Sequence, residues 1–96
     1  MNKQTIIESI KNKKQYLKNE FGVEEIALFG SFARGEEKID SDIDFLVTFN
    51  KPSFSKLMGL YEYLQKTLNS KVDVIRKGPH LSANFLKLIN KDIIYV

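Results

Sequence analysis

The chain has 96 residues, of which 43% are hydrophobic, and this allows one small domain spanning residues 1–96, with a modest core and no room for a second domain. It has no cysteine and one histidine, His80, so disulfides, cysteine-based zinc sites and histidine clusters are excluded and any metal must be held by oxygen. The net charge is only +3 and the lysines are spread along the chain, so we expect solvated faces rather than a nucleic-acid surface. No apolar run is long enough to cross a membrane and no signal peptide is recognisable, which favours a cytoplasmic protein.

The chain is expected to begin with an amphipathic helix over residues 2–20. Its apolar residues recur at helical spacing, its lysines fall on the opposite, solvated face, and Thr5 with Glu8 can form a capping box. Gly22 is expected to end this helix. Val23 to Phe29 then reads as a short interior strand, because its last four residues are all apolar.

The stretch after this strand carries the chemistry. Gly30 allows a close backbone approach, and Ser31 is expected to begin a short helix whose free N–H groups attract phosphate. A second strand follows and is expected to begin with two carboxylates, Asp42 and Asp44. Because side chains alternate along a strand, these two acids project from one face. Two adjacent acids on a buried strand favour a bound divalent cation, so the stretch predicts a phosphate cradle beside a metal platform.

A long helix and a third strand are expected next. Ser53 can cap the helix, and the strand, residues 71–75, carries Asp73 among valines and isoleucine. Asp73 faces away from the valines and lies beside Asp42 and Asp44 if the strands are neighbours. The apolar residues of the helix that we expect in the core are Phe54, Leu57, Met58, Tyr61, Leu64 and Leu68.

The remaining residues complete an α/β (α+β) fold. The basic loop over residues 76–80 is either an ordinary turn or a contact for substrate phosphate. Residues 82–90 predict a helix that buries Phe85, Leu86 and Ile89, and residues 92–96 predict a strand at a sheet edge. We therefore expect a mixed sheet of about four strands with helices mainly on one face and the site on the other face, at the phosphate turn. The strand order stays open.

One spacing resembles that of a known family. Gly30-Ser31, ten intervening residues and then Asp42-Ile43-Asp44 resemble the signature of the nucleotidyltransferases related to DNA polymerase beta, and specifically the minimal nucleotidyltransferases. Asp73 stands where that family places its third acid. The chain departs from the family at Phe32, where an arginine is common, so that Arg34 is the cation of the turn.

The resemblance implies an activity and a set of residues. The implied reaction is Mg²⁺-dependent transfer of a nucleoside monophosphate, AMP from ATP, to a hydroxyl, such as a tyrosine of a paired HEPN-family toxin. Asp42, Asp44 and Asp73 would be the catalytic acids and the ligands of two Mg²⁺ ions, as in-line phosphoryl chemistry requires. Gly30, Ser31 and Arg34 would hold the nucleotide phosphates.

Two other readings stay open. The chain could be a non-catalytic or weakly catalytic antitoxin that neutralises its HEPN partner by binding alone. A small nucleic-acid-binding domain has weaker support, because the chain has no aromatic-rich RNA-recognition strand and no basic recognition helix. Homo-oligomerisation is also open.

Overall fold

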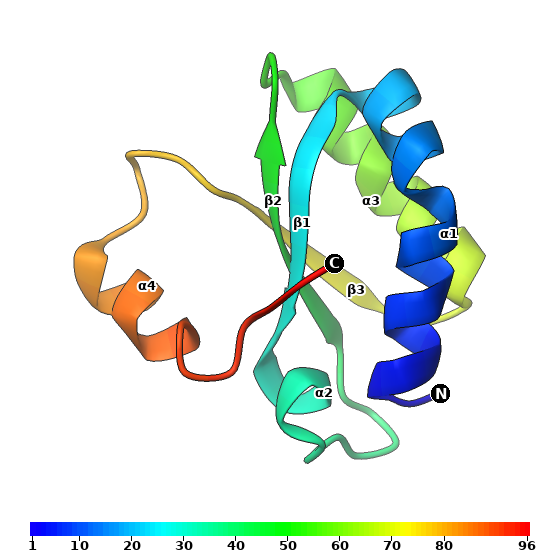
Figure 1. Cartoon of the computed structure of the whole chain (residues 1–96), viewed down its shortest axis with the longest axis vertical. Helices are drawn as coiled ribbons and strands as arrows, with labels where there is room; N and C mark the ends of the chain where they lie inside the picture. Colours follow the sequence, from blue (N-terminus) through cyan, green and yellow to red (C-terminus); the bar gives the residue numbers. More distant parts are fainter.

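Four helices and four strands alternate along the chain in a computed structural model that describes residues 1–96 (Figure 1). In chain order they are α1 (Lys3–Phe21), β1 (Val23–Phe29), α2 (Gly30–Arg34), β2 (Ile43–Phe49), α3 (Phe54–Leu68), β3 (Val72–Arg76), α4 (Ala83–Ile89) and β4 (Ile94–Tyr95).

The strands form one mixed sheet in the order β3-β2-β1-β4. β1 is antiparallel to both of its neighbours, β2 and β4, whereas β2 and β3 are parallel. The parallel pair is connected through α3, as a parallel connection requires a crossover. The predicted α/β fold with a four-stranded mixed sheet is confirmed, and β4 lies at an edge as expected.

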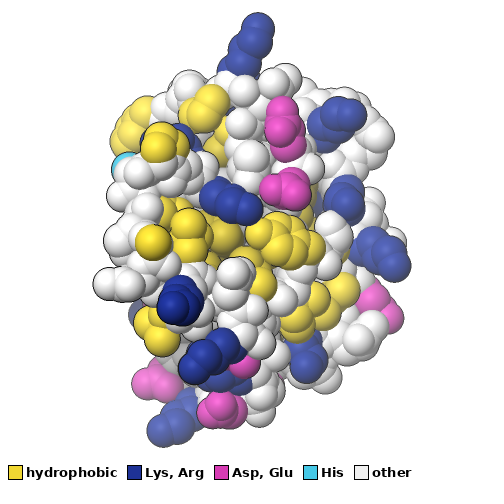
Figure 2. Space-filling model, turned by 60° about the vertical axis from the view of Figure 1, so that its left-hand side comes forward, with side chains coloured by type: hydrophobic (Ala, Val, Ile, Leu, Met, Phe, Trp, Pro, Cys, Tyr) yellow, Lys and Arg dark blue, Asp and Glu magenta, His cyan; other side chains and the backbone are white.

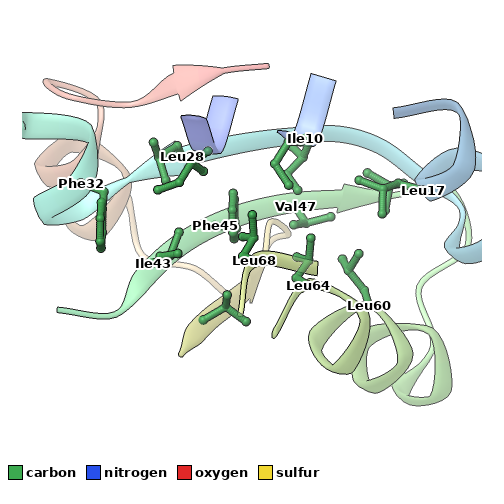
Figure 3. Packing of buried hydrophobic residues seen from close by; sticks show 14 of the residues in the cluster. Ile10, Leu17, Leu28, Phe32, Ile43, Phe45, Val47, Leu60, Leu64 and Leu68 are labelled. Carbon is green, nitrogen blue, oxygen red and sulfur yellow. The ribbon is translucent and has the colours of Figure 1, made fainter. Parts of the chain in front are cut away.

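The two faces of the sheet are covered unequally. α1 and α3 pack on one face and enclose the main core, whereas the shorter α4 lies on the opposite face (Figure 1). Figure 2 shows the α4 side of the molecule, where hydrophobic side chains reach the surface between lysine and arginine side chains. Core side chains from both helices and the sheet meet in Figure 3, among them Ile10 and Leu17 of α1, Phe45 and Val47 of β2, and Leu60, Leu64 and Leu68 of α3.

α1 is capped differently from the prediction. Asn2 is its N-cap: the Asn2 side-chain oxygen accepts a hydrogen bond from the Thr5 backbone N–H, and the Thr5 hydroxyl accepts one from the Asn2 N–H, both at 3.0 Å. The predicted box between Thr5 and Glu8 is therefore wrong, because Asn2 starts the helix earlier and Glu8 accepts from Gln4 instead. Gly22 ends the helix in the left-handed region at φ 70°, as expected.

The buried face of α3 also differs from the prediction. Leu60, Leu64 and Leu68 are fully or almost fully buried, whereas Phe54 is 78% exposed and Met58 is 38% exposed. Phe54 and Met58 were therefore wrongly expected in the core. The reason is that α3 turns its Leu60–Leu64–Leu68 row, at i, i+4 spacing, toward the sheet, so the Phe54–Met58 row faces outward.

The C-terminal helix α4 buries less than predicted. Ser82 caps it, and only Ile89 is buried, while Phe85 and Leu86 are half-buried. Phe85 packs edge-on against Phe29 of β1, with the ring centres 6.2 Å apart. A helix of seven residues covers only part of this face, on which Asp73 of β3 stays exposed. No helix in the chain has the length and apolarity that a membrane span needs.

Candidate active site

The end of β1 and the start of α2 bring the backbone against Asp44. Gly30 has φ 78°, a conformation that side chains rarely adopt, and a Cβ added there would collide with the Asp44 carboxylate. Glycine is therefore required at this position for two independent reasons, the backbone angle and the contact. α2 begins at Gly30, one residue earlier than predicted.

Two of the predicted acids lie side by side on the face opposite the main core. Asp44 of β2 pairs with Phe29 of β1 on one side and with Asp73 of β3 on the other. Side chains at paired positions of neighbouring strands project from the same face about 5 Å apart. Asp42 lies just before β2, which begins at Ile43, so the expectation that the strand starts with two carboxylates is corrected for Asp42.

The pKa of Asp44 shows that the acids act on one another. The pKa of Asp44 is raised from 3.8 to about 6, chiefly by burial and then by the negative charges of Asp73 and Asp42, while the Arg34 charge lowers it. Both Asp42 and Asp73 are exposed, and Asp44 is half-buried between them. A carboxyl group held among like charges in a partly desolvated site is typical of functional sites.

The donors fit a hard divalent cation in kind. All three are carboxylates, and oxygen ligands of this type are those that Mg²⁺ prefers. The side chains are not gathered into a closed cage, since no group of three or more Asp, Glu, His or Cys residues is close enough to hold a metal as it stands. Asp42 and Asp73 are exposed and can change rotamer, so a cation could draw both toward Asp44.

The start of α2 can bind an anion beside these acids. No side chain caps its first turn, so the backbone N–H groups there have no capping partner. α2 has only five residues, and the N–H groups themselves are therefore expected to matter more than the helix dipole. Ser31 is half-buried in this turn, and exposed Arg34 forms an ion pair with Glu36, with 3.3 Å between Nε and Oε1.

The basic loop after β3 lies away from the acids. Arg76 pairs with Val47, three residues along the strands from the pair of Asp44 with Asp73, a distance of about 10 Å. Arg76 is 3.1 Å from the His80 ring nitrogen, and Lys77 donates a hydrogen bond of 3.2 Å to the Tyr95 hydroxyl. That hydrogen bond, followed by the charge of Tyr95, raises the pKa of Lys77. Side chains of this loop thus engage one another and β4.

Comparison with known proteins identifies the class. The model of the nucleotidyltransferase domain family matches residues 10–95, and the chain belongs to this family. It is therefore an enzyme of the nucleotidyltransferase class, as the sequence resemblance implied. The protein adenylyltransferase MntA of Thermococcus cleftensis is 44% identical over 84 residues, which cover 86% of this chain and 84% of the relative. A relative from Methanocaldococcus jannaschii is 47% identical over 94 residues, which cover 95% and 94%.

Solved structures share the fold. A structure described as a minimal nucleotidyltransferase superposes with a TM-score of 0.79 at 26% identity, covering 98% of this chain and 95% of that one. A chain from the Shewanella oneidensis complex of a tri-AMPylated HEPN toxin with its MNT antitoxin superposes with a TM-score of 0.63 at 22% identity, covering 97% and 70%. The fold expected from the sequence is that of these proteins.

Proposed function

We propose that this chain is a Mg²⁺-dependent protein adenylyltransferase that moves AMP from ATP to a tyrosine hydroxyl of an HEPN-family partner protein. The observation that carries the proposal is the placement of Asp44 between Asp73 on one side and the Gly30 turn on the other. The relative from Thermococcus cleftensis, which is named a protein adenylyltransferase, supports AMP as the transferred group. The AMPylated toxin in the Shewanella oneidensis complex supports a protein acceptor of the HEPN type.

The reaction uses the site's residues in separate roles. The acceptor oxygen forms a bond to the α-phosphorus of ATP as the bond to pyrophosphate breaks, and the hydroxyl proton passes to a carboxylate, for which Asp73 is the candidate. Asp42, Asp44 and Asp73 would hold Mg²⁺, which when bound neutralises the charge that grows on the phosphoryl oxygens. The N–H groups at Gly30 and Ser31 would hold the β- and γ-phosphates, with Arg34 adding charge.

A binding antitoxin is the second candidate function. The three carboxylates are not gathered into a closed cage, and a protein of this size has few residues with which to build an acceptor pocket. A chain that only covers its partner would need the fold and surface but not the acids. The difference between the two functions is therefore chemical and can be measured by whether label from ATP reaches the partner.

Radiolabelled ATP tests the proposal directly. The chain is incubated with ATP labelled at the α-phosphate, Mg²⁺ and the purified product of the adjacent gene, and label is located by peptide mapping. We expect label on a tyrosine of the partner, with equimolar release of pyrophosphate and none in EDTA. Asp44→Asn is the matched variant and should abolish labelling, because it removes one charge without changing size. Inhibition of the partner by this variant at full strength, with no labelling by the native chain, would support the binding antitoxin instead.

A further inference from the structure

The strand order indicates from which side the acceptor hydroxyl approaches the α-phosphorus in the proposed transfer. The phosphate turn follows β1, Asp44 lies on β2 and Asp73 lies on β3, in the spatial order β3-β2-β1. In an in-line displacement the attacking and leaving oxygens lie on opposite sides of the phosphorus. With pyrophosphate held at the Gly30 turn, the acceptor hydroxyl must approach from the β3 side. β3 is an edge strand with no neighbour on its outer side, so this approach is open.

An apolar surface lies beside this edge. α3 packs on β3 and presents residues at i, i+3, i+4 and i+7 spacing, of which Phe54 is 78% exposed. We name the surface formed by Phe54, Leu57, Met58, Tyr61 and Val74 the α3–β3 surface. The exposed apolar side chains of this surface are not needed for the core, because α3 already buries its row of leucines there. A contiguous exposed apolar patch is typical of a binding surface.

A cavity lies in the α3–β3 surface and is bordered at the β3 edge by Asp73, whose side chain projects from the other face of the sheet. Its volume is about 150 Å³, and its walls are Leu57, Met58, Tyr61, Val74 and Asp73. Four of these five residues are hydrophobic and the fifth is the acid nearest the expected path of the acceptor. A buried apolar cavity of about this volume can hold a benzene ring, so this surface hollow has room for one aromatic side chain.

We propose that the α3–β3 surface is the docking site of the acceptor protein. An aromatic side chain of the acceptor fills the cavity, and the reacting tyrosine hydroxyl reaches across the β3 edge toward Asp73. The inference rests on the proposed transfer to tyrosine and adds where the partner binds and what it must carry, namely an exposed tyrosine among apolar side chains. A second copy of this chain is a less suitable occupant, because it would close the only side from which the acceptor hydroxyl can reach the α-phosphorus.

The cavity can be tested without catalysis. The chain, labelled with ¹⁵N and with ¹³C in its methyl groups, is titrated with p-cresol, the side chain of tyrosine, in the absence of nucleotide. We expect shift changes and intermolecular contacts at the methyl groups of Leu57, Met58 and Val74. Met58→Gln should weaken p-cresol binding about tenfold. Leu88→Gln, which changes a residue that is 69% exposed on α4, should leave binding unchanged.

The transfer reaction supplies the second test. Phe54→Gln should raise the KM for the partner protein about tenfold while the KM for ATP stays constant, because Phe54 lies outside the nucleotide site. Absence of transfer by the native chain would contradict the proposed function. The p-cresol titration does not depend on transfer and tests the α3–β3 surface separately. The surface proposal is overturned if p-cresol changes the chemical shifts of other residues instead. It is also overturned if the resonances of the α3–β3 surface broaden as protein concentration rises, without p-cresol, because a second copy of the chain would then occupy the surface.

Discussion

Asp44 makes the folded chain less stable at neutral pH. Its pKa is about 6 in the folded protein and 3.8 as the ordinary value, so the protonated acid is favoured by folding. The stability that this preference contributes is fully present below pH 3.8 and is lost as the pH rises through 6. The Asp44 carboxylate at pH 7 therefore lowers the stability of the folded chain, as the proposed metal-binding role would require.

Replacing this acid should stabilise the protein. Asp44→Asn is expected to raise the free energy of unfolding at pH 7 by about 1–2 kcal/mol, a value reduced for the solvent screening of a half-buried group. Urea unfolding in EDTA between pH 3.5 and 7.5 measures it. The gain should shrink as the pH falls from 6 to 4, and exposed Asp40→Asn serves as the control. Equal stability of the native and Asp44→Asn proteins at pH 7 would contradict the electrostatic account.

The proposed role of Gly30 can be tested by comparison with Gly35, a glycine with a similar backbone conformation. Gly30 begins α2 and Gly35 follows its end, at φ 78° and 71°, but a Cβ at Gly35 meets nothing within 4 Å. Either change to Ala should cost about 1 kcal/mol of stability through backbone strain. Only Gly30→Ala should also displace Asp44 and lower kcat/KM for ATP, by about a hundredfold. Equal activity of the two variants would show that the close approach at Gly30 has no functional role.

The candidate site residues stand out in the sequence because their signal is local. Gly30, Ser31 and Asp44 lie within one turn and one strand, and alternation along a strand predicts which face Asp44 occupies. The second strand was predicted to begin at Asp42, one residue too early, because strand ends depend on hydrogen-bond partners that the local sequence does not specify. The apolar cavity beside Asp73 was missed, and exposed Phe54 became a signal only once the buried row of α3 was known.

At the scale of elements, α3 has two overlapping apolar rows. Its sequence offers Phe54, Met58 and Tyr61 on one row and Leu60, Leu64 and Leu68 on another, and only the sheet beneath decides which is buried. Periodicity therefore predicted the helix and the burial of Leu64 and Leu68, but it missed the outward position of Phe54 and Met58. The cap of α1 was missed for a related reason, since Asn2 and Thr5 form a capping pair outside the usual Ser/Thr-to-Glu pattern.

Paired alanine variants test the rotation of α3. Leu64→Ala should lower the free energy of unfolding by about 2–5 kcal/mol, because it opens a cavity in the core. Phe54→Ala removes a larger side chain but should change stability by no more than about 0.5 kcal/mol, because that side chain is exposed. Urea unfolding of both proteins at pH 7 provides the comparison. A larger loss for Phe54→Ala would mean that the Phe54–Met58 row, rather than the Leu60–Leu64–Leu68 row, is buried.

At the scale of the whole molecule, ligand binding should raise stability through linkage. ATP with Mg²⁺ at about 100 times its Kd should raise the free energy of unfolding by about 2.7 kcal/mol, seen as a higher Tm. ATP in EDTA should give much less, because the carboxylates then face the phosphates without a cation. Asp73→Asn should also reduce the Mg²⁺-dependent increase. A shift that does not depend on Mg²⁺ would place the nucleotide away from the acids.

The strand order could not be predicted because it depends on contacts that are distant in the sequence. A parallel β2–β3 pair and the return of β4 to β1 each follow from packing of α3 and α4 on opposite faces. From the sequence alone, Asp73 could therefore be expected beside Asp44 only on the condition that their two strands are neighbours. The number of strands and their mixed character were predictable, since each strand is short, apolar and bounded by turn residues.

The open edge at β3 also bears on solubility. A bare edge strand is a template for intermolecular strand pairing and fibril growth, and charged side chains on such an edge oppose it. Asp73 and Arg76 supply those charges on β3. A hydrophobic replacement of Asp73 should therefore produce aggregates, whether or not it also lowers activity, so this carboxylate opposes self-association at the β3 edge.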